Sequence, residues 1–452
     1  MPANPGLPSL VWESDSLLPI FPRPLVLPSL RSLSSLALLL GMALALGLDA
    51  QTLPPGESAF SPQLLERSDV DRALEWIEEN FENQVAEWIL INEIPAPSGL
   101  EEARGRYVAE QMEAEGLEVS VDGIGNVVGL RQGVADGPTL VFAAHLDTVH
   151  PIDTDVAVER DGEVLRAPGI FDNSASVANM LAMIRALERT GLQTAGDLIF
   201  IGTAQEEVGL RGMIHWLEEN EGVADMLIAM DGGLGRIPYG ALGIYWSWFH
   251  FLGEGSHTNT SAGRPNPARA LSDAIASIYE LEIPEDRGGA VYNVGMLRGG
   301  SVFNAIPERA SFSVDLRSVN PVLLDSLQAE IQDRVAQAAD GHGVRWEMEE
   351  ENRMPAGGTA EDLADRRQHP LILTAEDVYG FLDLPNEPVA SGSTDANAGV
   401  VRGIPSISVG RSEGGDQHTL SEWAHWPSAL PATRAVLLLA LSLSGVADSP
   451  QP

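Results

Sequence analysis

Short apolar runs in the middle of the chain end in acidic or imidazole side chains. The run TLVFAAHLDTVHP reaches His145, and the run from Leu198 to Thr203 precedes Glu206 and Glu207. A third run, DMLIAMDGG, ends at Asp231. Short apolar runs bounded by polar residues are typical of buried strands, and α/β sheets place their chemistry beyond the carboxyl ends of the strands. The pattern predicts an α/β domain with reactive side chains at one edge of its sheet.

A helix is predicted where apolar residues recur between Val177 and Leu187, and Asp172 lies at its entrance. An acidic residue there is commonly a helix N-cap. The following Asn173, Ser174 and Ser176 could cap equally well, which would leave Asp172 free to bind metal.

A fourth apolar run, PSISVGRSEGGDQHTLSEW, continues to His418. Two imidazoles and three carboxylates at such positions suit a pair of divalent metal ions. Asp147, two residues after His145, can reach the far nitrogen of that ring and fix its tautomer. Taken singly, each position has a simpler explanation, such as a strand end with a turn, or a solvated loop for the pair Glu206 and Glu207. Their repetition at strand after strand favours the metal site.

The stretch from Gly240 to about Glu350 has a different character. IYWSWFHFLGEGSHTNTSAG alternates as a half-buried strand would, ARALSDAIASIYELE is helix-like, and AVYNVGMLRGG and ASFSVDLRSV are strand-like. Helices together with strands of antiparallel appearance predict a small α+β insert.

The motifs HLDTVHP, GIFDNSAS, AQEEVGLRG, MDGG and GGDQHTLSEW, in this order, resemble the co-catalytic di-zinc aminopeptidase, aminoacylase and peptidase T family, often called metallopeptidase family twenty. The resemblance covers roughly Leu74 to Leu443. It implies an α/β, mixed-sheet di-zinc exopeptidase catalytic domain in two parts, 71–239 and 352–446. A smaller α+β lid or dimerisation domain, 240–351, is inserted between them.

The resemblance also implies roles for the residues of the strand ends. One metal ion would be held by His145, Asp172 and Asp231, and the other by Asp172, Glu207 and His418. Asp172 therefore bridges, and Glu206 is the general base that takes a proton from water. Zn²⁺ is the default for such ligands, although Co²⁺ or Mn²⁺ would also be accepted. The family often has Lys or Ala where this chain has Ser174.

Three residues of the insert match functional positions of the family. His257 corresponds to the imidazole that supports the oxyanion, often in the partner subunit's site, while Asn304 and Arg317 correspond to residues that hold the substrate. A surface histidine and a strand-face charge are the simpler explanations for His257 and Arg317. In SGSTDAN, Gly392 and Ser393 are further candidates for substrate binding.

Composition narrows the choice of partners. The chain has 65 acidic and 27 basic residues, and every basic residue is Arg. A surface this negative disfavours nucleic acid and anionic membranes. Without cysteine, metal ligands must be oxygen and nitrogen atoms.

The first fifty residues have the order of a secretory signal. Arg23 and Arg31 precede an apolar run from Leu36 to Leu48, and small residues follow, with cleavage after Ala45 or Ala50. The run is shorter than the roughly twenty residues of a membrane span. We therefore expect a signal peptide over 1–50, a linker over 51–70, and a secreted or periplasmic protein without a membrane anchor after cleavage. ATRAVLLLALSLSG should form a buried closing helix.

These observations predict a metal-dependent hydrolase that cleaves an amide bond in a small peptide or an acylated amino acid. Within the family, Asp at the position of Asp231 accompanies aminopeptidases and dipeptidases, which favours an exopeptidase of aminopeptidase, dipeptidase or tripeptidase type. An N-acyl or N-carbamoyl amino acid amidohydrolase would share every metal ligand. An inactive binding protein on the same scaffold is a third alternative, which the intact ligand set disfavours. The resemblance allows a homodimer through the lid domain.

Overall fold

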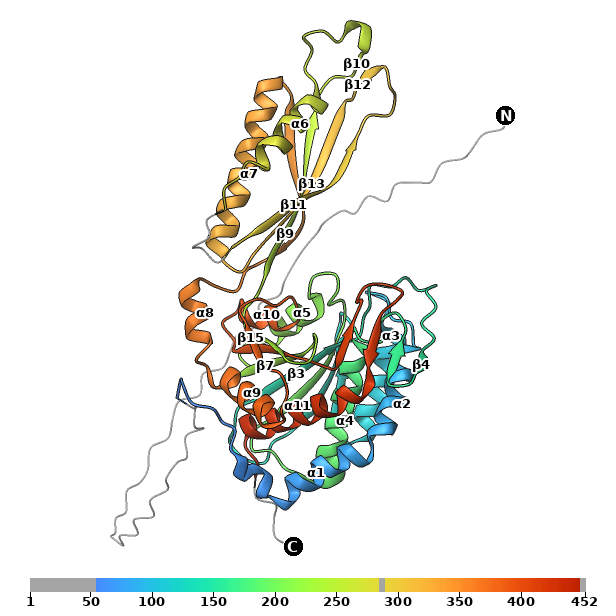
Figure 1. The fold of residues 1–452 in the computed structure, drawn as a ribbon, viewed down its shortest axis with the longest axis vertical. Coiled ribbons are helices and arrows are strands. Elements are labelled where there is room, and N and C mark those ends of the chain that lie inside the picture. The colour runs from blue at the N-terminus through green and yellow to red at the C-terminus, as the bar shows by residue number, and fades with distance from the viewer. Residues whose placement is uncertain (1–53, 284–288, 448–452) are drawn as a thin grey trace, which may run out of the picture. The chain divides into compact units, whose positions relative to one another are not determined.

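The computed structural model describes residues 54–283 and 289–447, and its larger domain is built on a six-stranded sheet (Figure 1). The strand order is β1-β2-β6-β3-β7-β16. The strands are β1 (Glu118–Val121), β2 (Val127–Arg131), β3 (Leu140–His145), β6 (Leu198–Thr203), β7 (Met226–Met230) and β16 (Ser406–Val409). Neighbours among β6, β3, β7 and β16 are parallel, whereas β2 pairs antiparallel with β1 and β6. The predicted mixed α/β sheet is confirmed.

Helices cover both faces of this sheet because its strands bury side chains on both sides. In β3, Leu140 and Phe142 face the core shared with α4 and α11, while Val141 and Ala143 face the core shared with α5 and α10. The helices of the domain are α1 (Ser68–Glu79), α2 (Phe81–Asn92), α3 (Glu102–Ala114), α4 (Ser174–Thr190), α5 (Arg211–Glu219), α8 (Ala360–Arg366), α9 (Pro370–Phe381), α10 (Ala396–Val400) and α11 (Ala429–Ser444).

The predicted closing helix is α11, and it is a core element. Among the described residues, one helical stretch, Trp426–Ser444, is long and apolar enough to cross a membrane by length and composition, and 72% of its apolar window is buried inside the protein. α11 packs against α4 and α9. Its apolar character is therefore explained by the core.

The segment expected to be a linker is in part folded. The 3-10 helix η1 (Pro62–Glu66) and the start of α1 lie within it. The ring of Phe60 lies 5.4 Å from that of Phe381, and Leu64 and Leu65 pack against the core. The apolar side chains between 59 and 65 account for this packing. The predicted signal peptide lies outside the described residues.

The smaller domain is a four-stranded antiparallel sheet, order β11-β13-β9-β14, with α6 and α7 along one face (Figure 1). Its elements are β9 (Gly243–Leu252), α6 (Pro267–Ile278), β11 (Val291–Gly299), β13 (Arg309–Ser318), α7 (Pro321–His342) and β14 (Arg345–Met354). Phe312, Val314 and Leu316 alternate into the helix-covered core, as the pattern predicts. The α+β character of the insert is confirmed, although β14 continues to Met354, past the predicted boundary at 351.

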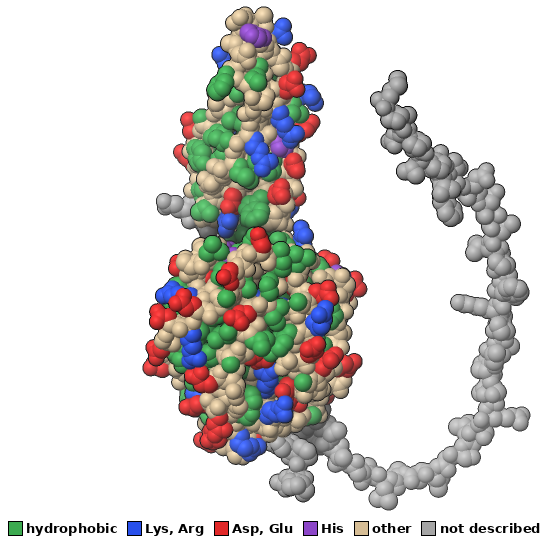
Figure 2. Space-filling view, turned by 90° about the vertical axis from the view of Figure 1, so that its right-hand side faces the viewer, with side chains coloured by type: hydrophobic (Ala, Val, Ile, Leu, Met, Phe, Trp, Pro, Cys, Tyr) green, Lys and Arg blue, Asp and Glu red, His purple; other side chains and the backbone are tan. Residues whose placement is uncertain are grey.

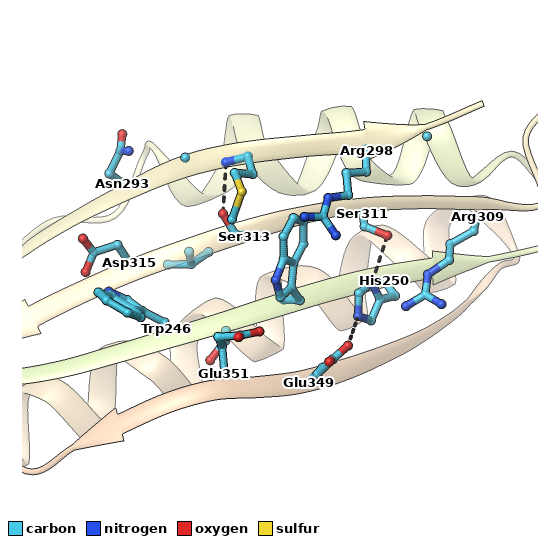
Figure 3. A pocket seen from close by; sticks show the side chains of 16 residues that line it. Trp246, His250, Asn293, Arg298, Arg309, Ser311, Ser313, Asp315, Glu349 and Glu351 are labelled. Atoms are coloured by element: carbon cyan, nitrogen blue, oxygen red, sulfur yellow. Dashed lines mark hydrogen bonds and ion pairs between the residues drawn. The ribbon is translucent and has the colours of Figure 1, made fainter. Parts of the chain in front are cut away.

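The other face of this small sheet carries a hollow of about 910 Å³ (Figure 3). The Arg298 guanidinium lies 4.1 Å from the ring centroid of Trp248, and His250 contacts Ser311 and Glu349. β9 is more buried than the predicted half-buried strand, and its most exposed residue is Trp246, at 41%.

The remaining elements are short and connect the main ones. They are β4 (Glu159–Asp161), β5 (Val164–Arg166), β8 (Arg236–Pro238), β10 (Ser256–His257), η2 (Thr258–Thr260), β12 (Ala305–Ile306), β15 (Glu387–Val389), β17 (Glu413–Gly415), β18 (Trp423–His425) and η4 (Trp426–Ser428). On the face shown in Figure 2, Asp and Glu side chains are spread out with Arg side chains between them rather than gathered into one patch.

Candidate metal centre

The parallel strands bring their carboxyl ends to one edge of the large sheet, and the predicted ligands meet there. His145 is the last residue of β3, Asp231 follows β7 directly, and Glu206 and Glu207 follow β6. Because β3 lies between β6 and β7, these side chains converge although they are far apart in the sequence.

Two groups of three potential ligands form, and they share one residue. Ligand atoms of His145, Asp172 and Asp231 lie within 4.8 Å of one another, and so do those of Asp172, Glu207 and His418. These are the two sets that the resemblance implies, with Asp172 common to both. His145, Glu206 and Glu207 form a third such group, so Glu206 also lies close to the cluster.

The ring of His145 lies against Asp147. Its Nδ1 lies 3.1 Å from the carbonyl oxygen of Asp147 and 3.5 Å from a carboxylate oxygen of the same residue. Its Nε2 lies 3.1 Å from Asp172 Oδ1 and 3.9 Å from Asp231 Oδ2. A proton on Nδ1, donated to Asp147, leaves the Nε2 lone pair directed at the carboxylates, where a metal ion would bind.

The carboxylate of Asp147 also holds the turn that carries the glutamates. It accepts hydrogen bonds from the backbone N–H groups of Glu206 (3.0 Å) and Glu207 (3.1 Å), and from Ser98 Oγ (2.6 Å). Asp147 is fully buried. It therefore couples the position of His145 to that of Glu206 and Glu207.

Asp172 lies two residues before the start of α4, and no side chain caps this helix. The helix begins at Ser174, and none of the three residues predicted as caps makes a side-chain capping bond. Asn173 Nδ2 instead donates to Met230 O (3.1 Å), and Ser174 Oγ donates to Asn92 (3.0 Å). The capping expectation is wrong because Asn173 and Ser174 bind other groups, while Ser176 Oγ is buried with no hydrogen-bond partner in the described structure.

A buried glutamate that the sequence did not single out, Glu422, anchors the loop of Asp172. Its carboxylate accepts backbone N–H groups of Gly169 (3.0 Å), Phe171 (2.9 Å) and Asp172 (2.7 Å). Glu422 lies in GGDQHTLSEW, 250 residues away along the chain. The sequence around Glu422 gives no indication of this contact, because its partners are about 250 residues away along the chain.

Arg411 is a second residue missed from the sequence. Its guanidinium, fully buried, lies 3.2 Å from Asp172 Oδ1, contacts Asp231 Oδ1, and lies 4.1 Å from the ring centroid of Phe171. Its Nη1 also donates to Asn173 (3.1 Å). Arg411 thus neutralises part of the charge on two candidate ligands.

His418 does not end a strand. β16 stops at Val409, β17 intervenes, and His418 lies in the following turn with a positive φ of 62°. Its Nε2 lies 3.2 Å from Glu207 and 3.5 Å from Asp172 Oδ2. The expectation that the fourth apolar run leads directly into His418 is wrong, because the glycine-rich segment leaves the sheet first.

Proton affinities in the cluster are shifted by burial and by the crowding of charges. Burial alone lowers the pKa of His145, but the carboxylates of Glu206, Asp147 and Asp172 together raise it well above its ordinary value. Hydrogen bonds to Asp172 and Glu207 raise the pKa of His418 to about 10. Without metal, both imidazoles therefore carry protons that a metal ion would displace.

The carboxyl groups divide into two kinds. Burial raises the pKa of Asp172, but Arg411 and the two imidazoles outweigh it and hold this pKa well below its ordinary value. Burial, assisted by Asp231, Asp395 and Glu207, raises the pKa of Glu206 well above its ordinary value although His145 opposes it. A proton-accepting group beside a strongly ionised ligand suits acid–base chemistry.

The donor set fits a pair of divalent ions. Glu207 Oε1 is buried and has no hydrogen-bond partner in the described structure, although such atoms are normally satisfied. Each group of three combines imidazole nitrogen with carboxylate oxygen, as catalytic zinc sites do. An ion bound by Glu207 would supply the missing partner.

Two of the candidate residues in the smaller domain lie close together, and neither belongs to the three groups of potential metal ligands. His257 and Asn304 line a cavity of about 590 Å³ on the smaller domain, where β10 pairs with β12. His257 Nδ1 accepts a hydrogen bond from Asn259 N (3.1 Å), which places the ring proton on Nε2. Both residues are exposed.

The other three candidates for substrate binding lie in two different places. Arg317 lies on β13, about one third exposed, and its guanidinium pairs with Asp315 at 3.0 Å. Gly392 and Ser393 line a cavity of about 220 Å³ together with Asp231. The structure thus brings the SGSTDAN loop to the metal centre, whereas Arg317 is paired within its own strand.

An open, largely parallel sheet with imidazoles and carboxylates at its carboxyl edge, and an inserted α+β domain, defines a metal-binding hydrolase of the α/β class. The family model described as Peptidase family M20/M25/M40 matches residues 141–442. The chain belongs to this family of metal-dependent peptidases and amidohydrolases, which confirms the resemblance seen in the motifs.

Curated relatives are distant and differ in their described activities. Carboxypeptidase G2 of Pseudomonas sp. (strain RS-16) is 24% identical over 47% of this chain and 52% of its own length. Succinyl-diaminopimelate desuccinylase of Methylobacterium radiotolerans is 29% identical over 58% of this chain and 70% of its own length. The chain spans about half the length of the first relative.

Solved structures agree with the fold. A tripeptidase of Staphylococcus aureus superposes with a TM-score of 0.70 at 20% identity, covering 81% of this chain and 99% of the other. Aminopeptidase PepT of Bacillus cereus gives a TM-score of 0.67 at 20% identity, covering 80% and 99%. YXEP of Bacillus subtilis, described as a dinuclear metal binding peptidase, gives 0.61 at 17% identity, covering 81% and 99%.

Proposed function

We propose that the protein hydrolyses the terminal peptide bond of small peptides, using two divalent metal ions and Glu206 as general base. The observation that carries the proposal is the pair of ligand groups joined through Asp172, with Glu206 beside them. Zn²⁺ is the proposed metal, since His and carboxylate ligands suit it.

Paired metal ions in such a site would polarise the scissile carbonyl and the attacking water. The chain's own residues supply the remaining steps. Glu206 takes a proton from the water and passes it to the leaving amine, and its raised pKa suits this exchange. The turn held by Asp147 keeps Glu206 in position.

In this proposal, the lid domain supplies the groups that bind the substrate and stabilise the negative charge on its carbonyl oxygen. His257, with its ring proton on Nε2, donates to the oxygen that becomes negative, and Asn304 holds the substrate beside it. Next to Asn304, Val302 and Phe303 are exposed apolar side chains, Phe303 completely so. Exposed apolar residues at this tip support contact with another surface, either the larger domain on closure or a partner subunit in a homodimer.

The class of substrate is inferred from Asp231 and from the relatives. Asp231 rather than Glu supports an aminopeptidase, dipeptidase or tripeptidase, and the peptidase structures of similar fold agree. A deacylase is the alternative, because a desuccinylase is among the relatives. We also propose export through the predicted signal peptide.

A substrate panel on the zinc-loaded protein tests the proposal. It contains dipeptides, tripeptides, N-acetyl amino acids and N-carbamoyl amino acids, with Glu206→Gln as the inactive control. We expect cleavage of the dipeptides and tripeptides, with release of their N-terminal amino acid. Cleavage restricted to acylated amino acids would replace the exopeptidase assignment, and no cleavage of any amide would favour a binding protein.

A further inference from the structure

A small cavity lies directly beside the candidate ligand Asp231. Its volume is about 220 Å³, and Gly232, Gly233, Arg236 and residues 391–394 also line it. This is smaller than the roughly 300–1,000 Å³ of sites for drug-sized ligands. It can therefore hold one side chain or one acyl group of a substrate whose amide bond lies at the metal centre.

Bare backbone forms part of the cavity wall. A Cβ atom added at Gly232 or Gly233 would meet no atom within 4 Å, and Gly232 has a φ of 91° that favours glycine. At Gly392, by contrast, an added Cβ would lie 2.9 Å from Pro238 Cβ. Glycine thus leaves space for a ligand on one side and permits close packing on the other.

The positive charge in this cavity comes from Arg236. Arg236 and Pro238 alternate toward the cavity along β8, while Ile237 between them is fully buried. Among the described residues, Arg236 is the one cation that lines the cavity, and its guanidinium takes part in no ion pair or side-chain hydrogen bond. Glu387 is its register partner on β15 and forms no ion pair with it in the described structure.

Arg236 differs from other arginines that are exposed and unpaired in the described structure, such as Arg72, because it lines a cavity that also contains Asp231. Acidic residues outnumber basic ones by 65 to 27, so carboxylates are abundant as partners. The other arginine of this region, Arg411, is committed to Asp172 and Asp231. A guanidinium fork binds carboxylates through two parallel hydrogen bonds, so Arg236 is suited to bind an anionic group of a ligand in this cavity.

We infer that Arg236 binds a carboxylate of the substrate in this cavity, so that the protein selects substrates with an anionic group near the scissile amide. The inference rests on the proposed hydrolysis at the adjacent centre. A side-chain carboxylate, an α-carboxylate and a dicarboxylic acyl chain share this chemistry.

Matched substrate pairs distinguish these sources. One pair differs by Glu against Gln, a second by α-carboxylate against α-carboxamide, and a third by an N-succinyl against an N-butanoyl group. Native protein should favour the anionic member of one pair by roughly tenfold to a hundredfold in kcat/KM, the range for hydrogen bonds to charged groups. Arg236→Met should abolish this preference, and Arg236→Lys should restore part of it.

Arg72→Met is the matched control, since Arg72 is exposed on α1 and does not line this cavity. It should retain the preference. A second measurement is independent of turnover: calorimetric binding of glutarate to the metal-loaded protein should weaken roughly tenfold in Arg236→Met and remain unchanged in Arg72→Met.

The outcomes separate the two proposals. Turnover with unchanged preference in Arg236→Met, or unchanged glutarate binding, would overturn the inference and leave the hydrolase intact. Absence of turnover with weaker glutarate binding in Arg236→Met would support the carboxylate site and reject the proposed reaction. Equal metal content in native protein and Arg236→Met confirms that the variant is folded.

Discussion

At the scale of single residues, the two adjacent glutamates have separate tasks. Glu206→Gln should retain both metal ions and lose on the order of 10²–10⁴ in turnover, because water still binds but no group accepts its proton. Glu207→Gln should instead lower metal content, since Glu207 Oε1 has no other partner in the described structure. Elemental analysis and initial rates measure both. Identical behaviour of the two variants would contradict this division.

Arg411 provides a second test at this scale. Without metal, Arg411→Met removes the buried guanidinium that pairs with Asp172 and Asp231, which should destabilise the protein by about 3–5 kcal/mol. Bound metal ions neutralise the same carboxylates, so metal should stabilise the variant more than the native protein.

Urea unfolding with and without a chelator measures this difference, and Arg411→Lys, which keeps the charge but not the fork, should be intermediate. Equal stabilisation of native and variant protein by metal would show that Arg411 does not compensate for the ligand charges.

Asp395 makes the stability of the metal-free protein depend on pH. Burial raises its pKa from 3.8 to about 7, and Thr203 Oγ1 donates to it at 2.5 Å. The folded chain therefore keeps this proton where the unfolded chain has lost it. The resulting stabilisation is complete below about pH 4 and is lost as the pH rises through about 7.

Asp395→Asn cannot lose the proton, so in chelator its free energy of unfolding should fall less steeply between pH 4 and 7 than that of native protein. Urea denaturation at several pH values checks this. Parallel pH profiles would exclude Asp395 as the titrating group.

At the scale of elements, periodicity predicted what depends on local sequence. β6 has the predicted bounds, and α4 and α11 form where apolar residues recur. The ligands could be predicted because each follows an apolar run or lies in a family motif. Arg411 and Glu422 could not, because their contacts with the Asp172 loop join segments more than two hundred residues apart.

The lid elements were predicted less completely. α7 begins at Pro321 after the capping side chain of Asn320 and ends before Gly343, which has a φ of 63°. These are ordinary helix boundary signals. The helix was nevertheless missed, although Leu327, Ile331 and Val335 are buried at helical spacing along it.

His257, the last residue of β10 in the lid domain, gives a prediction for this element. His257→Ala should lower turnover while metal content and folding remain unchanged, because His257 is exposed and lies outside the ligand groups. Native turnover in this variant would return His257 to the role of a surface histidine.

If the imidazole is supplied by a partner subunit, mixing inactive His257→Ala chains with inactive Glu206→Gln chains should restore part of the activity. Restoration requires subunit exchange, which labelled chains can demonstrate. Exchange without restored activity would indicate that each chain uses its own His257.

At the scale of the whole molecule, the proposed activity requires two metal sites joined through one residue, Asp172. The two domains have separate cores, and the larger domain brings candidate ligands together from five places in the chain. Removal of both ions leaves several carboxylates close together, and each one that stays ionised is repelled by the others. The metal-free protein should therefore be less stable than the metal-loaded form.

The most direct test counts the metal ions bound per chain in native protein and in Asp172→Ala, after dialysis against zinc and buffer. Asp147→Asn is the control, because it should weaken affinity by roughly 10–100-fold without removing a ligand. The account predicts about two ions in native protein and a fall toward zero in Asp172→Ala. Two retained ions in Asp172→Ala would contradict it.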